Sequence, residues 1–336
     1  MTNPPIKIGP LKADEVAEAE RIVRLAFGTF LGLPNPLEVM GDRNFLTPRW
    51  RATHTKVIAA RQDGRLIGSN VATRWGSFGF FGPLTVLPEY WDHGVATRLL
   101  EVTMKIFDRW GVRHTGLCTF PHSPKHVGLY QKFGYWPRYL TAIMTRTPDA
   151  DPRATAPGGE GLLRLSSLAR NRRESTIEAC RKLTGKIDKG LDLTGEIRAV
   201  LAQGTGEVVL TSTRGVLDGF ALCLNGPGSE GGEKVCYVKF GAARAGKGAG
   251  ERFDKLLEAC EALARSRGAT VEAGVNWSRE DAFRRMRAHG YRVITQSVAL
   301  QRSHVHASKP KAVPPCGMGT PAGFNRPDAY VMDDWR

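Results

Sequence analysis

The stretch that decides the fold reads GPLTVLPEYWDHGVATRLLE and covers residues 82–101. A run of strand-forming residues is followed by a turn that contains Gly94. Beyond the turn, apolar residues recur at spacings of 4, 3 and 4, which places them on one face of a long helix. They are Val95, Leu99, Val102 and Ile106. The stretch therefore predicts a strand, a glycine turn and an amphipathic helix.

The turn also predicts an anion site. The first N–H groups of a helix have no partner within the helix, and the helix dipole adds positive charge at that end. Gly94 and Ala96 are small enough to let phosphate oxygens approach the main chain. An ordinary strand-to-helix turn is the alternative. The residues expected to hold a phosphate-bearing group are Asp92, His93, Gly94, Val95, Ala96 and Thr97.

The plan around this stretch occurs twice in the chain. Each copy predicts a short apolar run, a helical region, a hairpin, a strand, a glycine turn, a long helix, a strand, a short helix and a terminal strand pair. Three pairs of glycines keep an offset of 151, 154 and 156 residues, namely Gly64 and Gly215, Gly94 and Gly248, and Gly134 and Gly290. We predict a tandem duplication of one α/β (α+β) domain.

Composition divides the chain at two places. Residues 148–159, PDADPRATAPGG, contain three prolines and predict a linker. From Ser303 onward, five prolines and three glycines in 34 residues predict an extended tail. The predicted domains are therefore residues 1–147 and 160–302. The tail is expected to be pinned near its end by Tyr330, Val331, Met332 and Trp335.

The overall composition favours an ordinary globular protein. Of its 336 residues, 41% are hydrophobic and 24% are charged, and no apolar run of 18 residues occurs. Met1 to Lys12 has no apolar signal core, so we expect a cytoplasmic protein. The six cysteines form no C-x-x-C pair, so neither a metal site nor a disulfide framework is expected.

The net charge of +15 favours a polyanionic ligand. Nucleic acid and a phosphate-bearing cofactor would both suit it, and a basic but unspecialised surface is the plainer explanation. No block of five or six basic residues occurs, which weakens the case for a nucleic-acid-binding arm. Neither nucleic acid nor a membrane is therefore expected as a partner.

A second motif lies downstream, Leu129-Tyr130-Gln131-Lys132-Phe133-Gly134-Tyr135. Together with the strand and turn above, it resembles the GNAT superfamily of acyl-CoA-dependent N-acyltransferases, over about Ile6 to Arg146. The family's pattern Leu-Tyr-x-x-x-Gly-Phe/Tyr is matched completely. The pattern Q/R-x-x-G-x-G/A is matched by Trp91 to Ala96, except that Trp91 replaces the usual Gln or Arg.

The resemblance implies two GNAT-like domains, each with a mixed, mostly antiparallel sheet flanked by helices. It implies transfer of an acyl group from acetyl-CoA, or another acyl-CoA, to a primary amine of a small molecule or protein. The amine would attack the thioester directly, and main-chain N–H groups of the strand would stabilise the oxyanion. Tyr130 would protonate the leaving thiolate. The implied cofactor contacts also include Leu84, Thr85, Val86, Leu87 and Ser123.

The general base is less defined by the pattern. His122 follows a predicted strand and is our first candidate, although a lone histidine is more often structural than catalytic. An ordered water could also relay the proton. The other candidates are His93, His126, Glu89 and His54.

The second copy carries a glycine-rich turn but lacks the tyrosine. Its turn could form a second phosphate cradle. Met286 stands where the first copy has Tyr130, so we predict that chemistry belongs to the first copy. The candidate cofactor contacts in this turn are Gly246, Lys247, Gly248, Ala249 and Gly250.

Two alternatives remain open. Tandem GNAT-like folds also occur in enzymes that transfer amino acids from charged tRNA, and a basic protein would suit tRNA. The small residues in both turns speak against it. The chain could instead bind acyl-CoA without turnover, as a sensor, and Tyr130 within a complete motif disfavours that interpretation.

Overall fold

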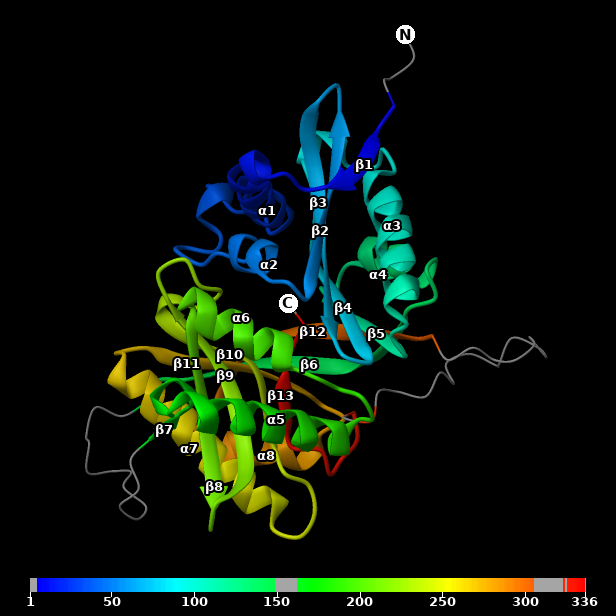
Figure 1. Cartoon of the computed structure of the whole chain (residues 1–336). Helices are drawn as coiled ribbons and strands as arrows, with labels where there is room; N and C mark the ends of the chain where they lie inside the picture. The colour runs from blue at the N-terminus through cyan, green and yellow to red at the C-terminus, as the bar shows by residue number, and fades with distance from the viewer. Residues whose placement is uncertain (1–4, 149–161, 305–322, 324, 336) are drawn as a thin grey trace, which may run out of the picture.

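The computed structural model describes residues 5–148, 162–304, 323 and 325–335 (Figure 1). Apart from Pro148, the predicted linker lies outside the described residues. We call residues 7–146 the first half and residues 163–303 the second half. None of the described helices is both long and apolar enough to cross a lipid bilayer.

The first half begins with a strand and a helical region and continues through a hairpin to the decisive stretch. Its elements are β1 (Lys7–Pro10), α1 (Val16–Phe30), α2 (Thr47–Arg51), β2 (Thr55–Gln62), β3 (Arg65–Trp75), β4 (Phe78–Val86), α3 (Val95–Trp110), β5 (His114–Thr119), α4 (Pro124–Gln131) and β6 (Trp136–Arg146). Short 3-10 turns at Ala13–Glu15, Pro36–Glu38 and Pro88–Tyr90 join some of them.

The second half repeats this order. Its elements are β7 (Leu163–Arg164), α5 (Arg170–Ile187), α6 (Thr194–Gln203), β8 (Gly206–Thr213), β9 (Val216–Gly226), β10 (Gly232–Ala243), α7 (Ala249–Ser266), β11 (Thr270–Asn276), α8 (Glu280–Ala288) and β12 (Arg292–Ser303). A further strand, β13 (Val331–Asp333), follows near the end of the chain. The shared order agrees with the predicted duplication, while α2 and α6 are additions to the predicted plan.

Both hairpins form as the turn residues predict. Asp63 and Gly64 join β2 to β3 with φ of 50° and 80°, and Arg214 and Gly215 join β8 to β9 with φ of 49° and 77°. Two successive residues of positive φ give the turn whose twist matches that of paired strands. A non-glycine residue at the first position is tolerated, and glycine at the second removes the steric cost.

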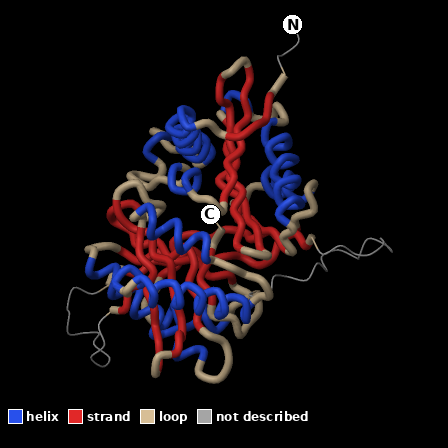
Figure 2. The backbone as a smooth tube through the Cα atoms, in the orientation of Figure 1, coloured by secondary structure: helices blue, strands red, loops and turns tan. Residues whose placement is uncertain are grey.

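One sheet runs through both halves, as Figure 2 shows. Its strand order is β1-β2-β3-β4-β5-β12-β6-β11-β10-β9-β8-β7, with β13 paired to β10. Two pairs are parallel, β4 with β5 and β10 with β11, and the other pairs among the described strands are antiparallel. The expected mixed, mostly antiparallel sheet flanked by helices is confirmed.

The two halves exchange their last strands. β6 pairs with β11 of the second half, and β12 pairs with β5 of the first half. β6 and β12 also pair with each other, which makes the centre of the sheet. The predicted terminal strand pair within each half is therefore wrong: each half supplies one strand, and the pair forms between the halves. Local periodicity cannot distinguish these pairings, because both leave the same faces buried.

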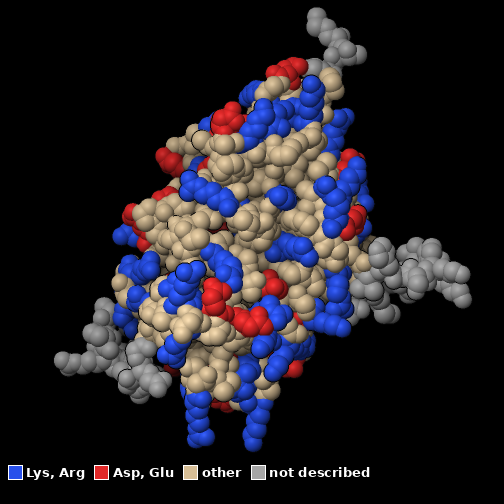
Figure 3. Space-filling model, viewed as in Figure 1, with Lys and Arg blue, Asp and Glu red and all other residues tan. Residues whose placement is uncertain are grey.

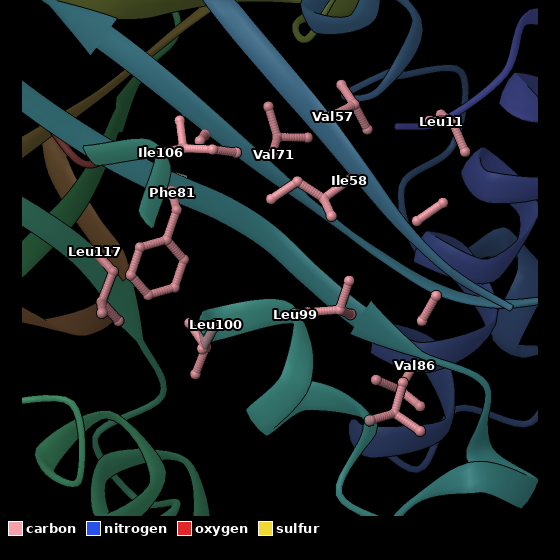
Figure 4. Close-up of a cluster of buried hydrophobic side chains, with 14 of the residues drawn as sticks. Leu11, Val57, Ile58, Val71, Phe81, Val86, Leu99, Leu100, Ile106 and Leu117 are labelled. Atoms are coloured by element: carbon pink, nitrogen blue, oxygen red, sulfur yellow. The ribbon is translucent and has the colours of Figure 1, made fainter. Parts of the chain in front are cut away.

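Apolar side chains fill the space between the sheet and its helices. In the first half, the apolar face of α3 packs on β2, β3 and β4, and the predicted face residues Val95, Leu99 and Ile106 are buried. Figure 4 shows Phe81 of β4 and Leu117 of β5 beside Leu100 of α3. The helix thus fixes the position of the two parallel strands relative to its own N-terminus.

A buried ionic network joins the halves. Arg49 of α2 donates from Nε and Nη2 to Glu230, at 3.0 and 2.7 Å. Lys239 of β10 lies 2.7 Å from Glu230 and 2.9 Å from Glu196 of α6. His54 Nε2 lies 2.9 Å from Glu196. These side chains are at most 9% exposed, so the charges are stabilised chiefly by one another.

Candidate functional site

Strands β4 and β5 run side by side for three residues and then separate. Phe78, Gly79 and Phe80 pair with His114, Thr115 and Gly116, and the backbone pairing between these two described strands stops there. β4 continues to Val86, paired on its other side with β3. The edge of β4 from Phe81 to Val86 that faces β5 is therefore free of a neighbouring strand. We call this space the first gap.

Leu84 and Val86 turn main-chain groups toward the first gap. The N–H of Leu87 donates to the carbonyl of Ile67 in β3, at 2.9 Å. Successive residues of a strand direct these groups to opposite sides, so Thr85 also faces β3, whereas Leu84 and Val86 face away from it. Leu87 is among the expected cofactor contacts, and its N–H is already bonded within the sheet, so Leu84 and Val86 are the residues whose main chain faces the first gap. The carbonyl of Val86 accepts from the indole Nε1 of Trp91 at 2.8 Å.

The outer end of the first gap meets the N-terminus of α3. Gly94 is the N-cap residue and adopts a left-handed conformation, with φ of 75°. A Cβ at this position would meet no heavy atom within 4 Å, so the space outside the turn is open. Val95 is buried in the core, which leaves its main chain as the part that can contact a ligand. The first N–H groups of α3 have no partner within the helix, so the turn has the geometry of an anion site.

Charged and polar groups around this turn come from the turn itself and from the start of α4. Asp92 adopts a φ of 67°, and its exposed carboxylate pairs with Lys125 of α4 at 2.7 Å. His93 is exposed, and its Nδ1 lies 2.7 Å from the carbonyl of Trp91. Ser123 is buried, and its hydroxyl caps α4 by accepting from the N–H of His126 at 3.4 Å. A cation thus lies beside the turn, on a flexible side chain that can leave Asp92 for a phosphate.

Tyr130 of α4 is buried beside the first gap. Its ring packs against Phe81, with 5.7 Å between the ring centroids, and the residue is 7% exposed. Burial raises the pKa of the phenol well above its ordinary value. Within the described residues its hydroxyl has no hydrogen-bond partner, whereas the neighbouring Tyr135 donates to Thr115 at 2.9 Å. Tyr130 therefore has a protonated hydroxyl with bonding capacity to spare.

His122 and His126 flank Phe30 of α1. The ring of His122 is stacked on Phe30 at 6.1 Å, and the ring of His126 lies 4.9 Å away. His122 is exposed, whereas His126 is half-buried and its Nδ1 has no hydrogen-bond partner within the described residues. Burial lowers the pKa of His126. This ring cluster, completed by Phe120, lies where α1, the end of β5 and α4 meet.

The remaining candidates for the base lie elsewhere. His54 contacts Glu196 in the ionic network between the halves, which gives it a structural role. Glu89 pairs with Arg65 at 2.8 Å on the surface. His93 bonds to the turn backbone. His126 and Tyr130 thus lie on α4, and His122 lies just before this helix. The other three candidates for the base lie apart from this group.

The second half reproduces the turn of the first. Gly248 is the N-cap residue of α7, with φ of 76°, as Gly94 is for α3. A shallow open cavity of about 410 Å³ lies at this helix end, lined by Gly246, Gly248, Arg285 and Tyr330 among others. Arg285 is already paired with Asp254 at 2.5 Å and with Asp281 at 2.9 Å.

The gap of the second half is filled by the chain itself. β10 pairs with β11 from Val235 to Val238, and then with β13 through Phe240, Gly241 and Ala242. β13 also lies against β11, where a Cβ on Gly274 would come within 2.4 Å of Asp334 Cβ. In Figure 1 β13, in red, lies among the strands of the second half. The expected pinning of this segment is confirmed: Val331, Met332 and Trp335 are buried, and Tyr330 donates to Asp281 at 2.6 Å.

The sequence did not indicate the hydrogen bond of Trp91, the role of Lys125 or the partner strand of β13. Trp91 departs from the family pattern, and the structure shows its indole bonded to the strand that borders the gap. Lys125 lies two residues beyond Ser123, at the start of α4. Since Ser123 is an expected cofactor contact, its neighbour Lys125 could have been predicted as one too. Nothing in the sequence of β13 indicates its partner strand.

Basic residues are spread over the surface. Figure 3 shows Lys and Arg over this face of both halves, with Asp and Glu between them. No single basic stripe of the kind that follows a nucleic-acid backbone stands out on this face. The feature suited to a phosphate group is therefore Lys125 beside the turn, rather than the net charge of the protein.

A parallel strand pair that opens toward a glycine-capped helix, with a buried tyrosine beside the opening, defines an acyltransferase fold of the GNAT type. Residues 27–135 match the family model described as the acetyltransferase (GNAT) family. The match lies within the first half, and solved GNAT structures share the fold of both halves.

Solved structures of similar fold cover nearly the whole chain. A Pyrococcus horikoshii protein assigned as an acetyltransferase is 15% identical, with a TM-score of 0.64 over 98% of this chain and 95% of that one. A tandem GNAT protein from the clavulanic acid biosynthesis pathway is 13% identical, with a TM-score of 0.55 over 89% and 98%. A GNAT-type N-acetyltransferase from Sphaerobacter thermophilus is 17% identical, with a TM-score of 0.53 over 90% and 97%. No curated protein matches the sequence significantly.

Proposed function

We propose that the chain transfers an acyl group, in the first instance acetyl, from acyl-CoA to a primary amine, and that the first gap is the single catalytic site. The observation that carries the proposal is the contrast between the halves. The same strand pair opens beside the same glycine turn in both, yet no described strand enters the first gap, whereas the second holds β13.

The shape of the first gap suits the coenzyme. Coenzyme A carries a pyrophosphate at one end of a thin arm with two amide groups and a thiol at the other. The turn at Gly94 supplies N–H groups for the phosphates, and Lys125 supplies a cation. The main chain of Leu84 and the N–H of Val86 offer the amides of the arm a strand edge to pair with. The thioester would then lie toward the inner end, where β4 and β5 meet.

The chemistry requires an oxyanion donor and a proton donor. A main-chain N–H of β4 at the gap, with Leu84 as the first candidate, would stabilise charge on the thioester oxygen. Tyr130 would give its proton to the leaving thiolate. Burial raises the pKa of that phenol and keeps it protonated at neutral pH, as a donor must be. The first half has this tyrosine, whereas Met286 fills the corresponding place in the second half.

The base is assigned to the ring cluster at Phe30. His122 is exposed and therefore accessible to an incoming amine or to water. His126 has a lowered pKa and is neutral at pH 7, so it can accept a proton. Either ring could take the proton directly or through a water molecule. Much of the rate enhancement would come from holding the amine and the thioester together.

The proposal is tested by acyl-CoA binding and turnover. The purified chain is titrated with acetyl-CoA in a calorimeter, and thiol release is then followed over a panel of amines. We expect saturable binding and amine-dependent thiol release. Binding without thiol release from any amine would favour the sensor alternative, and no binding at all would contradict the proposal. Release that depends on charged tRNA would favour the aminoacyl-transfer alternative.

A further inference from the structure

Trp335 lies against the strands of the first half. Its ring is 5.0 Å from that of Phe78, measured between centroids, and the residue is only 4% exposed. A Cβ built on Gly116 would come within 2.8 Å of the indole ring, and one built on Gly82 would lie 4.0 Å from the carbonyl oxygen of Trp335. The side chain therefore packs onto the strand pair with no intervening layer.

This position is the inner end of the first gap. Gly116 belongs to the last pair before β4 and β5 separate, and Gly82 comes two residues after the other member of that pair, Phe80. A Cβ on Gly79 would point to Phe107 of α3, and successive residues of a strand face opposite sides. The indole thus covers the strand pair on the face away from α3.

The second half holds the segment that carries Trp335. β13 is built into its sheet, and Asp333 pairs with the buried Arg279 at 2.8 Å. The same guanidinium donates to the carbonyl of Val331 at 2.8 Å. Tyr237 donates to Asp334 at 2.6 Å. These buried contacts precede Trp335 directly, so the indole is held by a rigid support.

We propose that Trp335 closes the inner end of the first gap and thereby limits the length of the acyl group that the site accepts. The inference rests on the proposed function, which puts the thioester at that end. An acetyl group ends where the strands meet, whereas each added methylene group must displace the indole. The gap of the second half then serves to hold the segment in place, which gives the second GNAT-like fold a role in selecting the donor.

The proposal predicts a change in selectivity on truncation of the indole. One methylene group is worth about 10- to 200-fold in discrimination by a closed pocket. We expect the wild-type chain to bind hexanoyl-CoA at least tenfold more weakly than acetyl-CoA. Trp335→Ala removes the barrier, so the ratio of the two dissociation constants should fall at least tenfold. Trp335→Phe keeps a smaller ring and should give an intermediate ratio.

The experiment is a calorimetric titration of each variant with acetyl-, butyryl- and hexanoyl-CoA. Trp277→Ala is the matched control, because Trp277 is 43% exposed and lies outside the first gap, and its ratio should equal that of the wild type. Melting curves identify variants that do not fold, and Trp335→Phe carries the test if Trp335→Ala is among them. An unchanged ratio in folded variants would overturn the inference. Failure of the wild type to bind any acyl-CoA would instead overturn the proposed function.

Discussion

Met332 is paired with Gly241 in the gap of the second half, and none of the described strands occupies the corresponding place in the first half. The fit is close, since a Cβ on Gly241 would come within 2.6 Å of Met332 Cε. A strand that pairs on a free edge satisfies the main-chain groups that a ligand arm would otherwise bind. The two folds are therefore similar in outline but different in what they can hold.

Gly94→Trp should weaken the binding of acetyl-CoA at least tenfold, or by about 1.4 kcal/mol. The bulky side chain would point into the open space outside the turn, where the phosphates are expected. Titration calorimetry on the folded variant measures the effect.

Gly111→Trp is the matched control for this change. Gly111 ends the same helix α3, also has a positive φ, of 61°, and also has open space where a Cβ would lie. Both substitutions carry a similar backbone cost, of about 1–2 kcal/mol for a side chain in the left-handed region. Equal affinity losses in the two variants would show that strain, not obstruction, is responsible, and that the phosphates lie elsewhere.

Tyr130→Phe should lower the turnover number on the order of 10²-fold and leave the Michaelis constant for acyl-CoA nearly unchanged. The hydroxyl is removed while the ring still packs on Phe81. Steady-state kinetics and a melting curve on the same preparation separate a catalytic from a structural role. A variant that loses melting temperature but keeps its rate would make Tyr130 a structural residue.

The pH dependence provides a second check on Tyr130. Burial raises the pKa of the phenol above its ordinary value of about 10, so the proton remains in place at every pH below 10. The rate should therefore show no loss attributable to this group between pH 7 and pH 10. The stability that this shift contributes is present below about pH 10 and is lost as pH rises through the higher folded pKa.

Arg49→Met should destabilise the protein by about 3–5 kcal/mol, because it removes one partner of a buried ion pair and leaves Glu230 with Lys239 alone. It also removes the donor that bonds the carbonyl of Gly82 at 2.6 Å. Chemical denaturation at pH 7 measures the change. Arg21→Met, which breaks an exposed pair with Glu18, is the control and should cost less than about 1 kcal/mol.

Acid should act on the same network. Burial alone would raise the pKa of Glu230, but Arg49 and Lys239 outweigh burial and lower it, and Lys239 and His54 do the same for Glu196. The stability that these carboxylates contribute is present above an unfolded pKa of about 4.3 and is lost as pH falls through the lower folded values. The unfolding free energy of Arg49→Met should fall less between pH 5 and pH 3 than that of the wild type. An equal fall in the two proteins would show that protonation of Glu230 is not the source of the acid sensitivity.

Local sequence patterns predicted the elements but not the pairing between halves. The spacing of Val95, Leu99 and Ile106, the turn glycines and the hairpin at Asp63-Gly64 each depend on neighbours within a few residues, and all formed as predicted. The exchange of β6 and β12 depends on contacts across more than a hundred residues, and either partner would bury the same face. Periodicity carries no information on that choice.

The same limit applies to the candidate site. Tyr130 and Gly94 belong to short motifs, so their places could be predicted from the sequence. The role of His54 could not, because its partner Glu196 lies on a helix of the other half. The burial of Met332 and Trp335 could be predicted as well, but the gap that β13 enters and the strands that Trp335 covers are set by tertiary structure.

The number of acetyl-CoA molecules bound per chain tests the central claim most directly. Calorimetric titration of the wild type should give one site, which Gly94→Trp weakens at least tenfold. The same substitution at Gly248, the corresponding N-cap of α7, should leave that site and most turnover intact, because β13 already fills the gap beside it. Two sites in the wild type, or loss of binding and turnover in Gly248→Trp but not in Gly94→Trp, would contradict the assignment of the first half as the catalytic one.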